Sequence, residues 1–131
     1  MSDPEVRGVV VGHGDMPQGL VDAVRHIAGA VADDLVAISN AGKGPAELTS
    51  DLNEAAGPGP VIVFTDLRSG SCGIAAAYSC KDGERRAVVC GVNLPMLLDF
   101  VFHRSMPVHE LAARVVETGR AAIQATPAAD S

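Results

Sequence analysis

The sequence predicts an α/β fold with an open, mainly parallel sheet of four strands in the order 2-1-3-4 and helices on both faces. Short apolar runs alternate four times with segments of helical period. The runs do not alternate polar with apolar residues, which is typical of strands covered on both faces. A length of 131 residues with 47% hydrophobic residues suits one buried core. We therefore expect a single domain over residues 1–131, in which 125–131 form a short Ala/Pro-rich tail.

The first half of the chain contains two strand–helix pairs. RGVVVGH (Arg7 to His13) and LVAISN (Leu35 to Asn40) have the length of strands. Each is followed by apolar residues at helical spacing: Leu20, Val24, Ile27, Ala28 and Val31 behind Pro17, and more weakly Ala46, Leu48, Leu52 and Ala55 after the turn-like AGKGP.

The second half repeats this order after the turn GPGP (57–60). PVIVFTD (Pro60 to Asp66) and RAVVCGVN (Arg86 to Asn93) are the predicted strands, and Cys90 is expected in the core. The helices are expected from near Ser71, with a capping serine, to about Cys80; from Pro95 to about His103; and, longest, from Val108 to Ile123. Because aromatic residues make up only 3%, Val, Ile, Leu and Ala must build the core.

Charge and composition exclude several classes of protein. With 10 Lys and Arg against 16 Asp and Glu, the net charge of −6 disfavours nucleic acid and anionic membranes as partners. No apolar run is long enough to cross a membrane, and the acidic start MSDPEVRG does not resemble a signal peptide. Three cysteines at scattered spacing do not form a disulfide framework. We expect a cytoplasmic protein with no membrane insertion.

The candidate chemistry lies after the first and third strands. In an open parallel sheet, ligands bind beyond the carboxyl ends of the strands where the strand order reverses. His13 ends the first strand and Asp66 ends the third, so the order 2-1-3-4 places them side by side. A carboxylate bonded to one ring nitrogen fixes the tautomer and leaves the other nitrogen free as a base, nucleophile or ligand.

A candidate anion site follows Asp66 in the sequence. Gly70 and Ser71 lead into the third helix, where backbone N–H groups and the helix dipole favour an anion. Together with His13 and Asp66 they suit a histidine that accepts a phosphoryl group on nitrogen. Cys72 lies at the same helix start, where a thiolate is favoured, so a redox role is an alternative for it.

Other interpretations of these residues are simpler. His13 could be an ordinary loop residue and Asp66 an ordinary helix cap. The C-x5-R spacing from Cys80 to Arg86 lies at the amino ends of the strands and lacks glycines, which argues against a phosphatase loop. Gly12-His13-Gly14 is followed by proline rather than glycine at position 17, so it is not a dinucleotide fingerprint. His26, His103 and His109 have no second ligand at metal spacing and are expected at the surface; no metal site and no cofactor are expected.

Four segments resemble the enzyme IIA domain of the mannose-type bacterial phosphotransferase system. These are VVVGHG, with the histidine at the end of the first strand; FTDLRSGS; GVNLPMLLDFVFHR, which is the most specific; and VETGRAAI. The resemblance extends from about Val9 to Gln124.

The resemblance implies a homodimeric, cytoplasmic phosphocarrier. His13 would take a phosphoryl group from the phosphocarrier protein HPr and pass it to a IIB domain that serves a sugar permease. Asp66 would bond the non-reacting ring nitrogen, and Ser71 with the neighbouring amides of Gly70 and Cys72 would hold the phosphoryl oxygens. The sugar cannot be inferred, because the carrier does not touch it.

This sequence departs from the family pattern at the rim of the site. The family commonly has a small-residue run after the aspartate and a proline after the serine; here Leu67-Arg68-Ser69 and Cys72 stand at these positions. Arg68 could clasp the phosphoryl group or contact an acidic partner. Two alternatives remain: a regulatory protein-binding module with the same fold, and a IIA-like subunit of a dihydroxyacetone kinase system.

Overall fold

The computed structural model describes residues 4–79 and 85–128 and contains one four-stranded parallel sheet in that part of the chain. The strands are β1 (Arg7–Gly12), β2 (Leu35–Ser39), β3 (Val61–Thr65) and β4 (Arg86–Cys90). Their order is β2-β1-β3-β4, and each neighbouring pair is parallel. The predicted fold class and strand order are confirmed.

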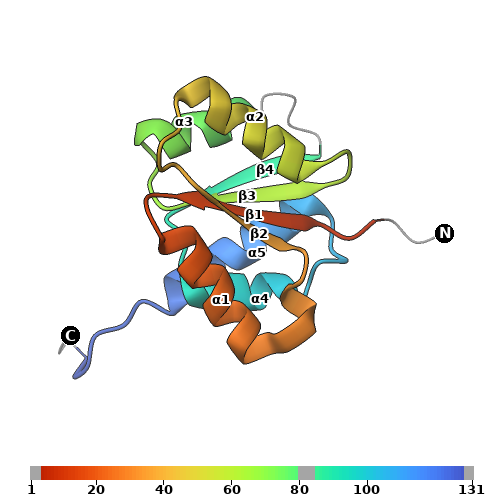
Figure 1. Cartoon of the computed structure of the whole chain (residues 1–131). Helices are drawn as coiled ribbons and strands as arrows, with labels where there is room; N and C mark the ends of the chain where they lie inside the picture. The colour runs from red at the N-terminus through yellow and green to blue at the C-terminus, as the bar shows by residue number, and fades with distance from the viewer. Residues whose placement is uncertain (1–3, 80–84, 129–131) are drawn as a thin grey trace.

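Helices cover both faces of the sheet (Figure 1). They are α1 (Met16–Ala28), α2 (Pro45–Ala56), α3 (Gly70–Ser79), α4 (Leu94–Val101) and α5 (Val108–Ala121). The helices α2 and α3 lie on one face, and α1, α4 and α5 lie on the other. Proline in the first turn of α1, α2 and α4 suits these helix starts, because the first-turn N–H groups have no partner within the helix.

Each face of the sheet has its own apolar core. Val10 and Phe64 point into the larger core, where the Phe64 and Phe100 rings meet edge to face with centroids 5.1 Å apart. Val9 and Val11 point into the other core beneath α2 and α3. Because successive side chains of a strand enter opposite cores, β1 after Arg7 and β3 before Thr65 are apolar rather than alternating.

The motif GVNLPML (residues 91–97) begins α4 and bonds it to α5 through Asn93. The Asn93 side-chain oxygen accepts a hydrogen bond from the Met96 N–H at 3.1 Å and so caps α4. The Asn93 side-chain amide donates to the Gly119 carbonyl of α5 at 3.0 Å. Gly119 packs tightly, since a Cβ there would lie 2.8 Å from Met96 Cε. Asn93 and Met96 of this motif therefore have structural roles, in capping α4 and in packing it against α5.

Two arginines at the amino edge of the sheet stabilise the end of α2. Arg7 Nη1 donates to the Ala55 carbonyl at 3.0 Å, and Arg86 Nη1 donates to Asn53 Oδ1 at 2.7 Å. Cations are favourable at a helix carboxyl end, where carbonyls lack partners. Cys80 lies outside the described residues, but Arg86 of the C-x5-R spacing contributes to this cap.

Two expectations need correction. The first predicted helix reached Val31, but the α-helix ends at Ala28 because Gly29 has φ +73°, and a 3-10 turn continues over Gly29–Ala32. Cys90 is exposed rather than in the core, because β4 is an edge strand and Cys90 is its last residue.

Within the described residues, no helix has the length and apolar character needed to cross a membrane.

Candidate functional site

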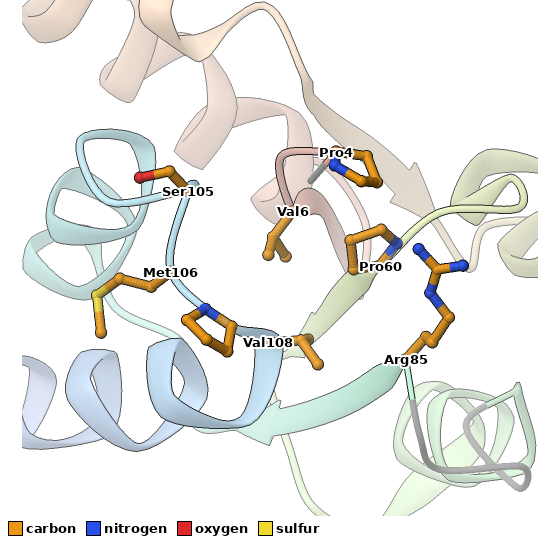
Figure 2. A pocket seen from close by; sticks show the side chains of 8 residues that line it. Pro4, Val6, Pro60, Arg85, Ser105, Met106 and Val108 are labelled. Atoms are coloured by element: carbon orange, nitrogen blue, oxygen red, sulfur yellow. The ribbon is translucent and has the colours of Figure 1, made fainter. Parts of the chain in front are cut away.

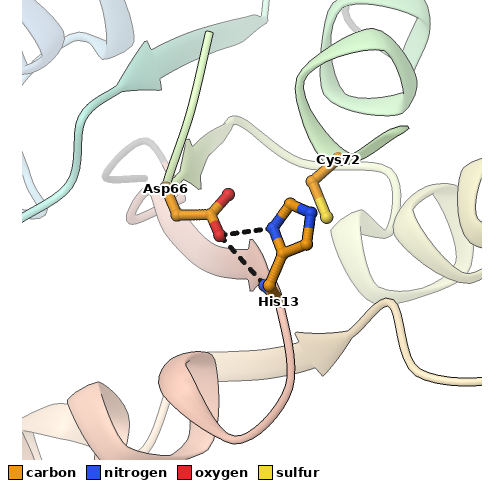
Figure 3. Close-up of side chains that lie close together, drawn as sticks. All are labelled: His13, Asp66 and Cys72. Carbon is orange, nitrogen blue, oxygen red and sulfur yellow. Dashed lines mark hydrogen bonds and ion pairs between the residues drawn. The ribbon is translucent and has the colours of Figure 1, made fainter. Parts of the chain in front are cut away.

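His13 and Asp66 meet at the carboxyl edge of the sheet, where β1 and β3 end side by side. Val11 of β1 pairs with Thr65 of β3, so the residues that follow the two strands emerge at the same edge. His13 Nδ1 lies 2.7 Å from Asp66 Oδ2, and the His13 backbone N–H donates to the same oxygen at 3.0 Å (Figure 3). The predicted juxtaposition of these side chains is confirmed.

The Asp66 carboxylate is held from several directions. Its other oxygen, Oδ1, accepts from the Leu67 N–H at 2.9 Å and from the Thr65 hydroxyl at 3.4 Å. Burial by itself raises the pKa of Asp66, but the hydrogen bonds from the His13 ring and amide, the attraction to the His13 charge and the Leu67 N–H outweigh it, so the pKa lies below its ordinary value. Asp66 is therefore ionised at neutral pH.

An ionised Asp66 determines which tautomer a neutral His13 ring adopts. A carboxylate only accepts hydrogen bonds, so Nδ1 carries the proton and Nε2 of the neutral ring has a free lone pair. The two side chains also differ in exposure, at 49% for His13 and 9% for Asp66. The arrangement presents a nitrogen nucleophile to solvent and keeps its partner covered.

The loop that carries His13 is also held by Asn40, the residue that follows β2. The Asn40 N–H donates to the Gly12 carbonyl at 2.9 Å, and the Gly14 N–H donates to Asn40 Oδ1 at 3.4 Å. Gly12 leaves room for the carboxylate, since a Cβ there would lie 3.1 Å from Asp66 Oδ2. The sequence motifs assign no role to Asn40, although its place directly after the second strand is a signal that could indicate one.

The first turn of α3 lies beside His13. One ligand atom from each of His13, Asp66 and Cys72 lies within 4.8 Å of the other two. Gly70 begins the helix with φ +89°, and Gly70 and Ser71 are both at least partly exposed. The structure thus brings the start of α3 to the His13 loop, and the binding of phosphoryl oxygens there stays a prediction.

The environment of Cys72 does not favour the thiolate that its position at a helix start predicts. Its side chain is fully buried and points toward His13 (Figure 3). Burial and then the negative charge of Asp66 raise the pKa of the thiol, more than the Ser71 hydrogen bond lowers it. The neutral thiol is the favoured form in this environment. The prediction of a thiolate, which was based on the helix start alone, was therefore wrong.

The loop between Asp66 and α3 packs closely on Gly73. A Cβ at Gly73 would lie 2.3 Å from the Arg68 carbonyl oxygen and 2.8 Å from that of Leu67. Leu67 is 54% exposed, and Arg68 is exposed as well. The two side chains therefore form part of the surface that a partner approaching His13 would meet.

The other histidines lie at the surface, as predicted. His26 and His109 are exposed, and the partly exposed His103 lies with Nδ1 2.8 Å from the Asp99 carbonyl and 3.1 Å from its carboxylate.

A hollow lies at the opposite, amino edge of the sheet (Figure 2). It is a cavity of about 220 Å³, and Pro4, Val6, Pro60 and Val108 contribute to its mainly apolar lining. Its lining contains Arg85 but no histidine, cysteine or carboxylate. The Ser105 hydroxyl also lines it, and none of its lining residues belongs to the His13 site.

Comparisons with known proteins agree with this geometry. The sequence model of a family described as PTS system fructose IIA component matches residues 8–117. Phosphotransferase system component EIIA from Streptococcus agalactiae is 25% identical, with a TM-score of 0.84 over 92% of this chain and 96% of that one. The mannose/sorbose specific IIA subunit from Enterococcus faecalis is 24% identical, with a TM-score of 0.83 over 98% and 99%.

A more distant structure shares the fold alone. The sigma-54 interaction domain protein from Enterococcus faecalis is 13% identical, with a TM-score of 0.73 over 92% of this chain and 94% of that one. No sequence among the curated proteins matches significantly.

Proposed function

The chain belongs to the family of phosphotransferase-system (PTS) fructose IIA components, and from this premise we propose that it carries a phosphoryl group on His13 between HPr and a IIB domain. Membership makes it a phosphotransferase component of a sugar PTS and confirms the resemblance to mannose-type IIA domains. The donor, the acceptor and the phosphohistidine are the parts that we propose.

The observation that carries the proposal is the 2.7 Å contact between His13 Nδ1 and Asp66 Oδ2. It leaves Nε2 as the nitrogen with a free lone pair on a half-exposed ring. In the proposed step, this lone pair attacks phosphorus as the bond between phosphorus and the donor breaks, and no proton needs to move. The ring becomes positively charged, and the adjacent Asp66 carboxylate stabilises that charge.

The start of α3 supplies the second part of the proposed site. Phosphoryl transfer depends mainly on positioning and on stabilising charge, so few catalytic groups are required. The backbone N–H groups of Gly70, Ser71 and Cys72 lie in the first turn of α3, where the helix dipole favours an anion. We assign the phosphoryl oxygens to these groups and to the Ser71 hydroxyl.

Partner proteins would reach His13 across an exposed rim. Met16 and Leu67 are exposed apolar residues on the two segments that bring His13 and Asp66 together, and Arg68 is an exposed cation next to Leu67. We assign Arg68 to contact with an acidic partner. We also propose that the protein acts in the cytoplasm as a homodimer; a monomer mass by light scattering at micromolar concentration would contradict the dimer.

The regulatory binding module is the second candidate. The likeness to a sigma-54 interaction domain protein concerns the fold alone. The ionised Asp66 beside an exposed His13 favours the carrier, because docking alone does not require a nucleophile with a fixed tautomer. The IIA-like subunit of a dihydroxyacetone kinase system would need a different acceptor from a IIB domain.

The test is phosphorylation by enzyme I, HPr and phosphoenolpyruvate. Wild type should gain one phosphoryl group that is labile in acid and stable in base, as expected for a phosphoramidate. His13→Ala should abolish labelling, whereas His26→Ala, which alters an exposed histidine of α1, should label at the wild-type rate. A folded wild-type protein that takes no phosphoryl group from HPr would overturn the carrier proposal and favour the binding module.

A further inference from the structure

Three metal-binding side chains converge at the carboxyl edge of the sheet. His13 follows β1, Asp66 follows β3, and Cys72 belongs to the first turn of α3. One ligand atom from each lies within 4.8 Å of the other two, and this is the one such group of three found in residues 4–79 and 85–128. Figure 3 shows the Cys72 sulfur directed toward the imidazole, with Asp66 on the opposite side of the ring.

The donor types indicate which metal would suit them. Sulfur, imidazole nitrogen and carboxylate oxygen together are typical of Zn²⁺, whereas Ca²⁺ and Mg²⁺ select oxygen alone. Tetrahedral zinc with bonds of about 2.0–2.3 Å requires donors roughly 3.3–3.8 Å apart. The present donors need movements on the order of 1 Å to meet that geometry, and the 2.7 Å hydrogen bond between His13 Nδ1 and Asp66 Oδ2 would open as the ion enters.

We propose that His13, Asp66 and Cys72 bind Zn²⁺ and that zinc and the phosphoryl group exclude each other at His13. Zinc binding itself does not depend on the proposed function, whereas the exclusion rests on it. The fourth zinc position would be left to water, as in sites with three protein ligands.

Charge balance supports a divalent cation at this place. Zinc converts the Cys72 thiol to a thiolate and releases its proton to solvent. The thiolate and the Asp66 carboxylate then balance the two positive charges of the ion, and His13 binds as neutral imidazole.

Zinc would compete with phosphoryl transfer for the same groups. The phosphoryl group needs the lone pair of His13 and the supporting carboxylate of Asp66, and zinc occupies both side chains. A bound ion would therefore hold the carrier in a form that cannot accept phosphate. Conversely, a phosphoryl group on His13 would remove one of the three zinc ligands and place its oxygens where the ion binds.

The first experiment measures zinc binding without any phosphotransfer. Reduced full-length protein is titrated with Zn²⁺ against a chromophoric chelator, and Co²⁺ is used to report sulfur coordination through its thiolate charge-transfer band. Cys72→Ser should weaken zinc binding by at least about 10-fold and abolish the cobalt band. Cys90→Ser, which changes the exposed cysteine of β4, should keep both signals.

Two results would overturn the site. Equal zinc affinity of wild type and Cys72→Ser is one, and loss of the cobalt band in Cys90→Ser is the other. His13→Gln provides a second variant that alters an exposed ligand instead of a buried one, so a folding defect in Cys72→Ser would not decide the matter. His13→Gln should also weaken zinc binding by at least about 10-fold.

The second experiment tests exclusion. Protein phosphorylated from phosphoenolpyruvate and separated from the donors should bind zinc at least about 10-fold more weakly than the unmodified protein. Equal zinc affinity before and after phosphorylation would overturn exclusion and leave the metal site intact. If the chain takes no phosphoryl group in zinc-free buffer, the carrier proposal fails, while the titration with Cys72→Ser still decides the zinc site.

Discussion

One oxygen of Asp66 accepts two hydrogen bonds from His13, at 3.0 Å from the backbone N–H and at 2.7 Å from ring Nδ1. The first bond holds the loop after β1, and the second holds the imidazole. Because the same atom makes both, a shift of the carboxylate would displace backbone and ring together. The proposed nucleophile is therefore positioned from β3 rather than by its own strand alone.

Asp66→Asn should slow phosphorylation of His13 by roughly 10- to 100-fold while the protein stays folded. The amide retains the shape and an accepting oxygen but loses the charge that stabilises the phosphorylated ring. Initial labelling rates measure the effect, and the nitrogen chemical shifts of the His13 ring report the tautomer. Asp22→Asn is the matched control, because Asp22 is exposed on α1 and accepts a bond from Gln18. A wild-type rate in Asp66→Asn would show that the carboxylate charge is not needed.

Asp99→Asn should lower the free energy of unfolding at neutral pH by about 1–3 kcal/mol. Asp99 is 11% exposed and accepts bonds from Arg114 at 3.1 Å and from the Thr118 hydroxyl at 2.8 Å, which connects α4 to α5. Urea unfolding at neutral pH measures the loss. Asp51→Asn, which removes an ion pair with Lys43 from a more exposed carboxylate, should cost less.

The same variant should change the acid dependence of stability. Burial raises the pKa of Asp99, but bonds from Arg114 and Thr118 and the charges of Arg114 and His103 lower it below 3.8 overall. A lowered folded-state pKa stabilises the protein fully above the unfolded value, and this contribution disappears as the pH falls through the folded value. The difference between wild type and Asp99→Asn should therefore be constant above about pH 5 and shrink below pH 3.8. A difference that grows on acidification would contradict this assignment.

The sheet and the pair of His13 and Asp66 could be predicted from the sequence. Both depend on the local pattern of apolar residues and on the rule that sites lie at the carboxyl ends of parallel strands where the strand order reverses. Apolar runs located the strands, and the strand order placed His13 beside Asp66. Asn40 and Gly12 were missed as positioning residues, because their contacts join segments that only the folded chain brings together. The Cys72 prediction failed for a related reason: a helix start predicts a thiolate, but burial and a neighbouring carboxylate reverse the sign.

Asn93→Ala should lower the free energy of unfolding by roughly 1–2 kcal/mol. The substitution removes the cap of α4 and the bond to the Gly119 carbonyl at once. Asn93→Asp keeps an accepting oxygen for the Met96 N–H but loses the donor to Gly119, so it should fall between wild type and Asn93→Ala. Equal stability of the Asp and Ala variants would show that the bond to α5, rather than the cap, is what Asn93 contributes.

Gly73→Ala should both destabilise the protein, by about 1–3 kcal/mol, and slow phosphorylation of His13. The added methyl group would lie 2.3 Å from the Arg68 carbonyl oxygen. Because that oxygen belongs to the backbone, the overlap is relieved only if the loop after Asp66 moves. That loop includes the Leu67 N–H, which donates to Asp66 Oδ1 at 2.9 Å, so a displacement of the loop would move the carboxylate that holds His13.

Gly19→Ala is the matched control, because Gly19 lies in α1 with open space around its Cβ position. This substitution should be neutral or stabilising by up to about 1 kcal/mol. Thermal unfolding and labelling rates measured on both variants separate the two effects. If Gly73→Ala loses stability but labels at the wild-type rate, the loop can move without disturbing Asp66, and the link from Gly73 to the site is wrong.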